Sequence, residues 1–309
     1  MAEKVGKKPD IRAAGVFISR LMNFEKGETS LMKEKHNLTK KHPIIAILLV
    51  VLVALLVVSG LSIVILMIVQ TAGLVDTSQS ELVTYAAMPI CSILFLILMR
   101  AWYSPEYKGV MKSGLSGKGT FLVCLPFIVY GVVFSIIQLI QFNFYFSPTL
   151  KDALMALTAG FSEEVFFRVA IIPIAMGFLK SKKRIWTIPL VTALIFGVSH
   201  IFNISSGATT VNAVVQVVSS AMFGFYFGAL FVCTGSALPG IIMHSVYDFV
   251  GFAGDPTLSS GIMVSTLSVG EIVYNLAITL LLPICGIIML KKTGCEKIEQ
   301  IWKNKWSIE

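Results

Sequence analysis

Residues 43–69 read PIIAILLVVLVALLVVSGLSIVILMIV, an apolar run without a single charged side chain. As a helix this run would extend roughly 40 Å, more than the hydrocarbon core of a bilayer, which is about 30 Å thick. It is also far longer than the apolar core of a cleavable signal peptide. The run therefore predicts a membrane-spanning helix that stays in the protein as a signal anchor.

The composition of the whole chain agrees with this first span. Of the 309 residues, 56% are hydrophobic and 14% are charged, and the mean hydropathy is +0.83. A water-soluble protein of this composition would expose large apolar patches. The class that the composition predicts is an integral membrane protein.

Basic residues gather before the first span. The formal net charge is +8, and ten of the 25 Lys and Arg side chains precede Pro43. A basic segment beside a first span is typical of a cytoplasmic anchor. The sequence shows no nucleic-acid recognition fold, so nucleic acid is not an expected partner.

The hydrophobic pattern predicts an all-α bundle of about eight transmembrane helices. Loops rich in Lys and Arg alternate with loops that hold none or one, which places both termini in the cytoplasm. The short, uncharged junction at 233–236 suits either a tight hairpin or a re-entrant segment. The predicted spans are residues 43–69, 83–101, 119–141, 152–179, 185–202, 210–233, 236–254 and 271–290.

The same pattern divides the chain into four parts. Residues 1–42 form a basic cytoplasmic segment, and residues 43–151 hold the first three spans. Residues 152–254 form a four-helix core, and residues 255–309 hold the last span and a basic cytoplasmic tail.

A few ionisable side chains fall inside the predicted spans of the core. Each costs about 2.5–3.5 kcal/mol at the centre of a bilayer on insertion scales, so their presence indicates a function or a pairing. They lie on three spans and are Glu163, Glu164, Arg168, His200, His244 and Asp248.

Helical spacing predicts how these side chains are arranged. Glu164 and Arg168 are four residues apart and can pair on one face, whereas Glu163 lies about 100° around the helix. We expect Arg168 to neutralise Glu164 and to leave Glu163 facing a reaction site. His244 and Asp248 are also four apart, so Asp248 either orients the imidazole or faces the same cavity. A purely structural ion pair is the alternative for Glu164 and Arg168.

Three motifs built from these residues resemble the CAAX protease and bacteriocin-processing family of intramembrane endopeptidases. The resemblance covers about 152–254, which in that family is the catalytic four-helix core. The motifs are Glu-Glu-x-x-x-Arg, Phe-x-x-x-His and His-x-x-x-Asp, formed by Glu163, Glu164 and Arg168, by Phe196 and His200, and by His244 and Asp248.

The resemblance implies hydrolysis of a peptide bond inside the membrane. Glu163, helped by His200, would deprotonate the attacking water, and His244 would support the oxyanion or the water. Asp248 stands where the family often has Asn; an ionised Asp only accepts hydrogen bonds, which argues against a role as oxyanion donor. The implied partners are the lipid bilayer and a membrane-associated protein or peptide substrate. The implied location is a cell membrane, the plasma membrane of a prokaryote.

Zinc is a possible cofactor. Glu163, His200 and His244 would make a carboxylate-plus-two-histidine set with an open position, although the chain contains no HExxH motif. Without metal, Glu163 and His200 would activate water directly. Two other functions remain open on the sequence: a proton-coupled transporter, and a non-catalytic membrane scaffold or bacteriocin-immunity protein.

Overall fold

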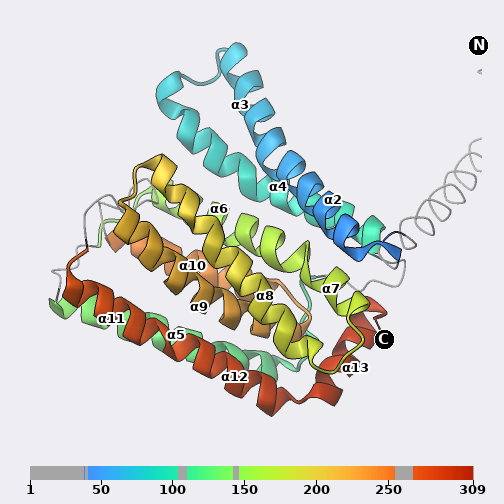
Figure 1. The fold of residues 1–309 in the computed structure, drawn as a ribbon. Coiled ribbons are helices and arrows are strands. Elements are labelled where there is room, and N and C mark those ends of the chain that lie inside the picture. Colours follow the sequence, from blue (N-terminus) through green and yellow to red (C-terminus); the bar gives the residue numbers. More distant parts are fainter. Residues whose placement is uncertain (1–37, 39–40, 104–109, 142–145, 255–266, 309) are drawn as a thin grey trace, which may run out of the picture.

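The computed structural model describes residues 38, 41–103, 110–141, 146–254 and 267–308 (Figure 1). Nearly all of the basic segment predicted at 1–42 lies outside these residues. Helices make up the regular structure throughout the described ranges, which contain no strand, and this confirms the predicted all-α class.

The helices before residue 146 are α2 (Pro43–Leu55), α3 (Leu61–Thr71), α4 (Ser80–Tyr103) and α5 (Gly117–Gln141). They are followed by α6 (Leu150–Glu164), α7 (Ile172–Phe178), α8 (Arg184–Ser199), α9 (Thr210–Thr234) and α10 (Leu238–Gly254). The last three are α11 (Val269–Thr279), α12 (Leu281–Thr293) and α13 (Cys295–Trp306).

Six helical stretches in the described residues are long and apolar enough to cross a membrane, so the protein is a multi-pass membrane protein. They match six of the eight predicted spans. The other two predicted spans correspond to the interrupted α6–α7 segment and to α10, which has 17 residues. The count of eight therefore stays a prediction. The six stretches are Pro43–Thr71, Thr77–Met99, Gly117–Ile137, Arg184–Ser206, Thr210–Thr234 and Val269–Thr293.

The continuous helix predicted at 152–179 is wrong, because the structure interrupts it. α6 ends at Glu164, and a π-helical turn follows at Val165–Val169. α7 then begins at Ile172, with Pro173 in its first turn. Proline has no backbone N–H for the preceding turn, and its ring crowds the carbonyl four residues earlier. The interruption places a wide turn directly after Glu163 and Glu164.

Helix α9 lies at the centre of the bundle. Over an 18-residue stretch of this helix, 56% of the residues are buried, a larger share than in the other five membrane-spanning candidates. Glycines let it approach α8 closely. A Cβ atom at Gly224 would lie 3.0 Å from the Cα of Ala193, and one at Gly228 would lie 3.1 Å from the Cα of Pro189. Small residues at such positions let helix backbones pack in a membrane without a hydrophobic driving force.

The α9–α10 junction is a tight turn. Of the two forms that the sequence left open, a tight hairpin and a re-entrant segment, this geometry is that of the hairpin. Gly235 adopts φ +60° there, a left-handed conformation that glycine reaches without strain. The turn brings α10 back against α6. At their crossing, a Cβ atom on Gly160 would lie 2.9 Å from the backbone nitrogen of Ser245 and 3.0 Å from the carbonyl oxygen of Ile241.

The start of α2, the α7–α8 connection and α13 lie at the same end of the molecule (Figure 1). The predicted alternation of basic loops requires these segments to share one side of the membrane. Which side is cytoplasmic stays a prediction from the Lys and Arg distribution.

Replacing Gly160 with Ala is expected to destabilise the protein, because the new methyl group would overlap the Ser245 hydroxyl and crowd the α10 backbone at Ser245 and Ile241. Overpacking of this kind costs about 1–3 kcal/mol. Thermal unfolding of the purified protein in detergent should show a lower midpoint for Gly160→Ala. Gly131→Ala in α5 is the matched control, since nothing lies within 4 Å of its Cβ position. Equal midpoints for the two variants would contradict the close crossing.

Candidate active site

The centre of the site is a buried ion pair on the segment that follows α6. Glu164 is the last residue of α6, and Arg168 lies in the π-helical turn. Arg168 Nη1 lies 3.4 Å from Glu164 Oε1, and both side chains are only 1% exposed. The pairing predicted from the spacing of these two residues is confirmed.

Two aromatic rings support the guanidinium group of Arg168. Its Cζ atom lies 4.5 Å from the ring centroid of Phe196 in α8 and 5.8 Å from that of Phe227 in α9. A cation over an aromatic face is attracted by the ring quadrupole, more strongly where water is excluded. The rings therefore stabilise a charge whose terminal nitrogens make no hydrogen bond to the residues that the structure describes.

His244 of α10 lies among three carboxylates. Its Nδ1 atom is 3.2 Å from Glu164 Oε1, and its Nε2 atom is 3.5 Å from both Glu163 Oε2 and Asp248 Oδ2. The imidazole also stacks on Phe227, with ring centroids 5.4 Å apart. Carboxylate oxygens accept hydrogen bonds, so this arrangement suits an imidazolium that donates from both nitrogens.

His200 has a different environment and a different chemical capacity. It follows the last residue of α8, and its Nδ1 atom lies 2.9 Å from the carbonyl oxygen of Phe196. A carbonyl only accepts, so Nδ1 carries the hydrogen, and in a neutral ring Nε2 keeps its lone pair. The edge of Phe196 contacts both His200 and His244, with centroid distances of 4.8 and 6.4 Å.

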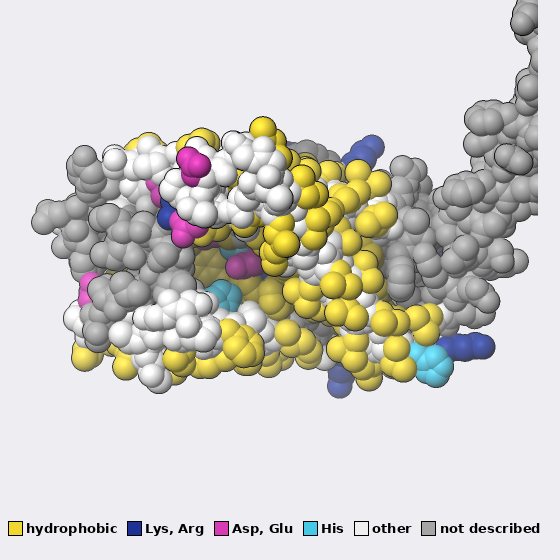
Figure 2. Space-filling model, turned by 90° about the horizontal axis from the view of Figure 1, so that it is seen from above, with side chains coloured by type: hydrophobic (Ala, Val, Ile, Leu, Met, Phe, Trp, Pro, Cys, Tyr) yellow, Lys and Arg dark blue, Asp and Glu magenta, His cyan; other side chains and the backbone are white. Residues whose placement is uncertain are grey.

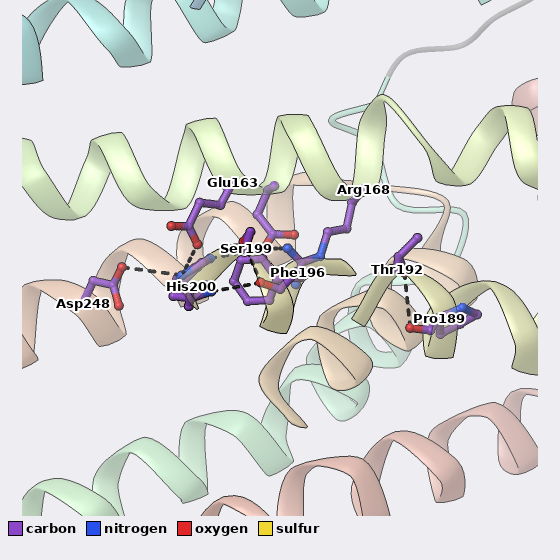
Figure 3. Close-up of polar contacts among 10 residues, drawn as sticks. Glu163, Arg168, Pro189, Thr192, Phe196, Ser199, His200 and Asp248 are labelled. Carbon is purple, nitrogen blue, oxygen red and sulfur yellow. Dashed lines mark hydrogen bonds and ion pairs between the residues drawn. The ribbon is translucent and has the colours of Figure 1, made fainter. Parts of the chain in front are cut away.

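Exposure separates the two adjacent glutamates. Glu164 is 1% exposed, whereas the side chain of Glu163 is 30% exposed and that of Asp248 is 19% exposed. Figure 2 shows a hollow in this face of the protein, with carboxylate and histidine side chains on its floor. In Figure 3, Glu163 of α6, His200 directly after α8 and Asp248 of α10 project into the same region. The more open carboxylates are thus the ones available to a substrate.

The donor geometry does not fit the zinc set that the sequence suggested. Across the described residues, no group of three or more His, Cys, Asp or Glu side chains is arranged to hold a metal ion. Both nitrogens of His244 face carboxylates, which leaves no lone pair directed at a metal. We therefore derive no step through zinc, and the zinc site stays a prediction.

Sequence reasoning missed three parts of this arrangement. It paired Glu164 with Arg168 but not with His244, and it did not include Phe227 or the π-helical turn. The first two depend on how α6, α9 and α10 pack, which no spacing within one helix can give. Pro173 was the one available signal for the interrupted helix.

The fold and the site together define a multi-pass helical membrane protein with a buried cluster of carboxylates, histidines and one arginine. Residues 145–250 match the family model described as type II CAAX prenyl endopeptidase Rce1-like. This match supports membership of the CAAX protease and bacteriocin-processing family, which the motifs predicted. The matched segment is about a third of the chain and contains all six site residues. Neither the curated proteins nor the solved structures include a match to this chain.

Replacing Arg168 with Met is expected to be strongly destabilising, since it removes the guanidinium partner of the buried Glu164 carboxylate and leaves His244 as its remaining partner. Breaking a buried pair in this way costs about 3–5 kcal/mol. Chemical denaturation in detergent should measure the loss. Lys151→Met is the matched control, because Lys151 pairs with Glu81 at 2.6 Å on the surface, where such a pair contributes about 0–1 kcal/mol. An equal loss of unfolding free energy in the two variants would show that the stability of the protein does not depend on the buried pair.

Proposed function

We propose that the protein is an intramembrane endopeptidase that hydrolyses a peptide bond in a membrane-associated protein or peptide. The observation that carries the proposal is the position of Glu163. It is a 30% exposed carboxylate that lies 3.5 Å from the imidazole of His244, inside the segment that matches an endopeptidase family. The proposed location is a cell membrane, the plasma membrane of a prokaryote, where the substrate would reach the hollow from the bilayer.

In the proposed mechanism, Glu163 is the general base. It takes a proton from a water molecule as the water oxygen attacks the scissile carbonyl carbon. The lone pair of His200 Nε2 accepts a hydrogen bond from the same water and orients it. Glu163 then passes the proton to the leaving amine as the C–N bond breaks, so that the carboxylate is restored.

His244 is the proposed donor to the oxyanion. When Glu163 engages the water, the N–H at Nε2 of His244 becomes available to the carbonyl oxygen that gains negative charge. Donors fixed in place before the reaction stabilise such a charge strongly in a water-poor site. Glu164 holds the opposite side of the ring through Nδ1 and keeps the donor pointing into the hollow.

Asp248 has a supporting role in this proposal. It lies 3.5 Å from the same Nε2 atom and, as a carboxylate, cannot donate to an oxyanion. Its carboxylate instead faces the N–H at Nε2 of His244 and helps to hold the ring in place.

Replacing Glu163 with Gln is expected to reduce peptide cleavage by roughly 10²–10⁴, the usual contribution of a general base. The amide keeps the shape of the side chain and loses its basicity. The measurement is turnover of a quenched, membrane-anchored peptide library by the purified protein in detergent, compared with His200→Ala. Glu81→Gln, at the surface, is the control and should cleave normally. Unchanged turnover in folded Glu163→Gln protein would refute the assignment.

Treatment with a zinc chelator is expected to leave cleavage within about twofold of the untreated rate, because His244 offers no lone pair to a metal. The same peptide assay, run with and without the chelator, measures the effect. Loss of cleavage with the chelator and its recovery on adding back zinc would instead require the carboxylate-plus-two-histidine site.

A further inference from the structure

The C-terminal helix α13 lies outside the segment that matches the endopeptidase family. It is amphipathic, and one face packs against the end of the bundle while the other is exposed. Its buried residues recur at helical spacing and are Ile298, Ile301, Trp302, Lys305 and Trp306. A helix that only packs an apolar face does not require a buried lysine or two buried tryptophans, whose polar atoms must find hydrogen-bond partners.

These three side chains bind the end of α9. Trp302 Nε1 donates to the carbonyl oxygen of Val232 at 2.8 Å, and Trp306 Nε1 donates to that of Gly235 at 3.1 Å. Lys305 Nζ donates to the same Gly235 oxygen at 2.9 Å and to the carbonyl oxygen of Lys112. The last carbonyls of a helix lack partners within the helix, so α13 satisfies carbonyls that would otherwise be unpaired.

The charge of Lys305 suits this position. Burial, together with the nearby Lys112, lowers the pKa of Lys305 to about 8, which leaves it mostly protonated at neutral pH. The C-terminal end of a helix carries partial negative charge, and a cation there is stabilising. Lys305 therefore works as a cap on α9 rather than as a surface charge.

The capped turn leads directly into α10. Within the turn, the Ala237 N–H donates to the carbonyl oxygen of Val110 at 2.8 Å, and the Ser236 hydroxyl donates to the same oxygen at 2.9 Å. Helix α10 begins at Leu238, and His244 follows within its first two turns. Any shift of the turn would move His244 relative to α6.

Helix α13 also forms an ion pair with the first residue of α8. Glu299 Oε1 lies 3.8 Å from Arg184 Nη2. Arg184 Nη1 in turn donates to the carbonyl oxygens of Met176 and Leu179 at the end of α7, at 2.7 and 3.0 Å. Because α7 continues the segment that carries Glu163 and Arg168, α13 is linked to that segment through Arg184, in addition to its direct contacts with the end of α9.

We propose that α13 braces the active site by fixing α10 against the α6–α7 segment, and that Lys305 and Trp302 are positioning residues for His244. Part of this proposal rests on the proposed peptidase function, since a rate can be affected only if the protein cleaves peptides. The bracing itself is a statement about helix position and does not depend on the reaction.

The test compares the full-length chain with Lys305→Met and Trp302→Phe, which keep the bulk of the side chains and remove the donors. Lys297→Met is the matched control, because Lys297 lies on the exposed face of α13. Hydrogen–deuterium exchange of residues 236–248 is measured for each protein. We expect exchange about tenfold faster in the two donor variants, as for the loss of a buried hydrogen bond, and no change in the control.

Cleavage kinetics supply the second readout. Misplacing His244 should lower kcat roughly tenfold in Lys305→Met and leave KM within about twofold, because the binding surface stays in place. A chain ending at Thr293 should show the same defect, and a synthetic peptide of residues 294–309 should restore it, whereas a peptide carrying Lys305→Met should not.

If residues 236–248 exchange at the wild-type rate in Lys305→Met and Trp302→Phe, the proposed bracing by α13 is wrong, whatever the cleavage result. Absence of cleavage by the wild-type protein, with faster exchange in the donor variants, would overturn the peptidase function and support the brace. Faster exchange with unchanged kcat would show that α13 holds the turn without positioning His244, which also contradicts the proposal.

Discussion

The site depends on one buried carboxylate, Glu164. Its Oε1 atom lies 3.4 Å from Arg168 and 3.2 Å from His244, so a single oxygen joins the π-helical turn to α10. Water is scarce in a membrane interior, and a charge there must be satisfied by the protein itself. Arg168 is supported in turn by the rings of Phe196 and Phe227, which bring α8 and α9 into the same arrangement. Four helical elements thus meet through one ion pair.

This constraint explains why two adjacent glutamates have different environments. Neighbouring helical residues project about 100° apart, so a helix that buries Glu164 against α10 leaves Glu163 on a more exposed line of the helix. The wide turn at Val165–Val169 then returns Arg168 to Glu164. π-Helical turns occur frequently at functional sites because they re-aim side chains in this way. Separate carboxylates can therefore supply structural charge and reactivity, and neither function compromises the other.

The sequence predicted much of the fold, because residue hydropathy reports directly on contact with lipid. Spacing within one helix also predicted the Glu164–Arg168 pair. It could not predict the contact between Glu164 and His244, which requires the crossing of α6 and α10 at Gly160. Nor could apolar composition locate the interruption before Pro173, since apolar residues continue on both sides of it. The hydrophobic pattern can predict helices, but it cannot predict which residues of different helices come into contact.

The dimensions of α10 give a physical reason for a brace outside the matched segment. With 17 residues, α10 is about 26 Å long, slightly less than the hydrocarbon thickness of about 30 Å. A helix that does not fill the bilayer is not held along the membrane normal by its own hydrophobic length. Its depth must come from neighbouring elements, and the turn at Gly235, bound by Lys305 and Trp306, is where such contacts act. A displacement of one residue along α10, about 1.5 Å, would be enough to separate His244 from Glu164.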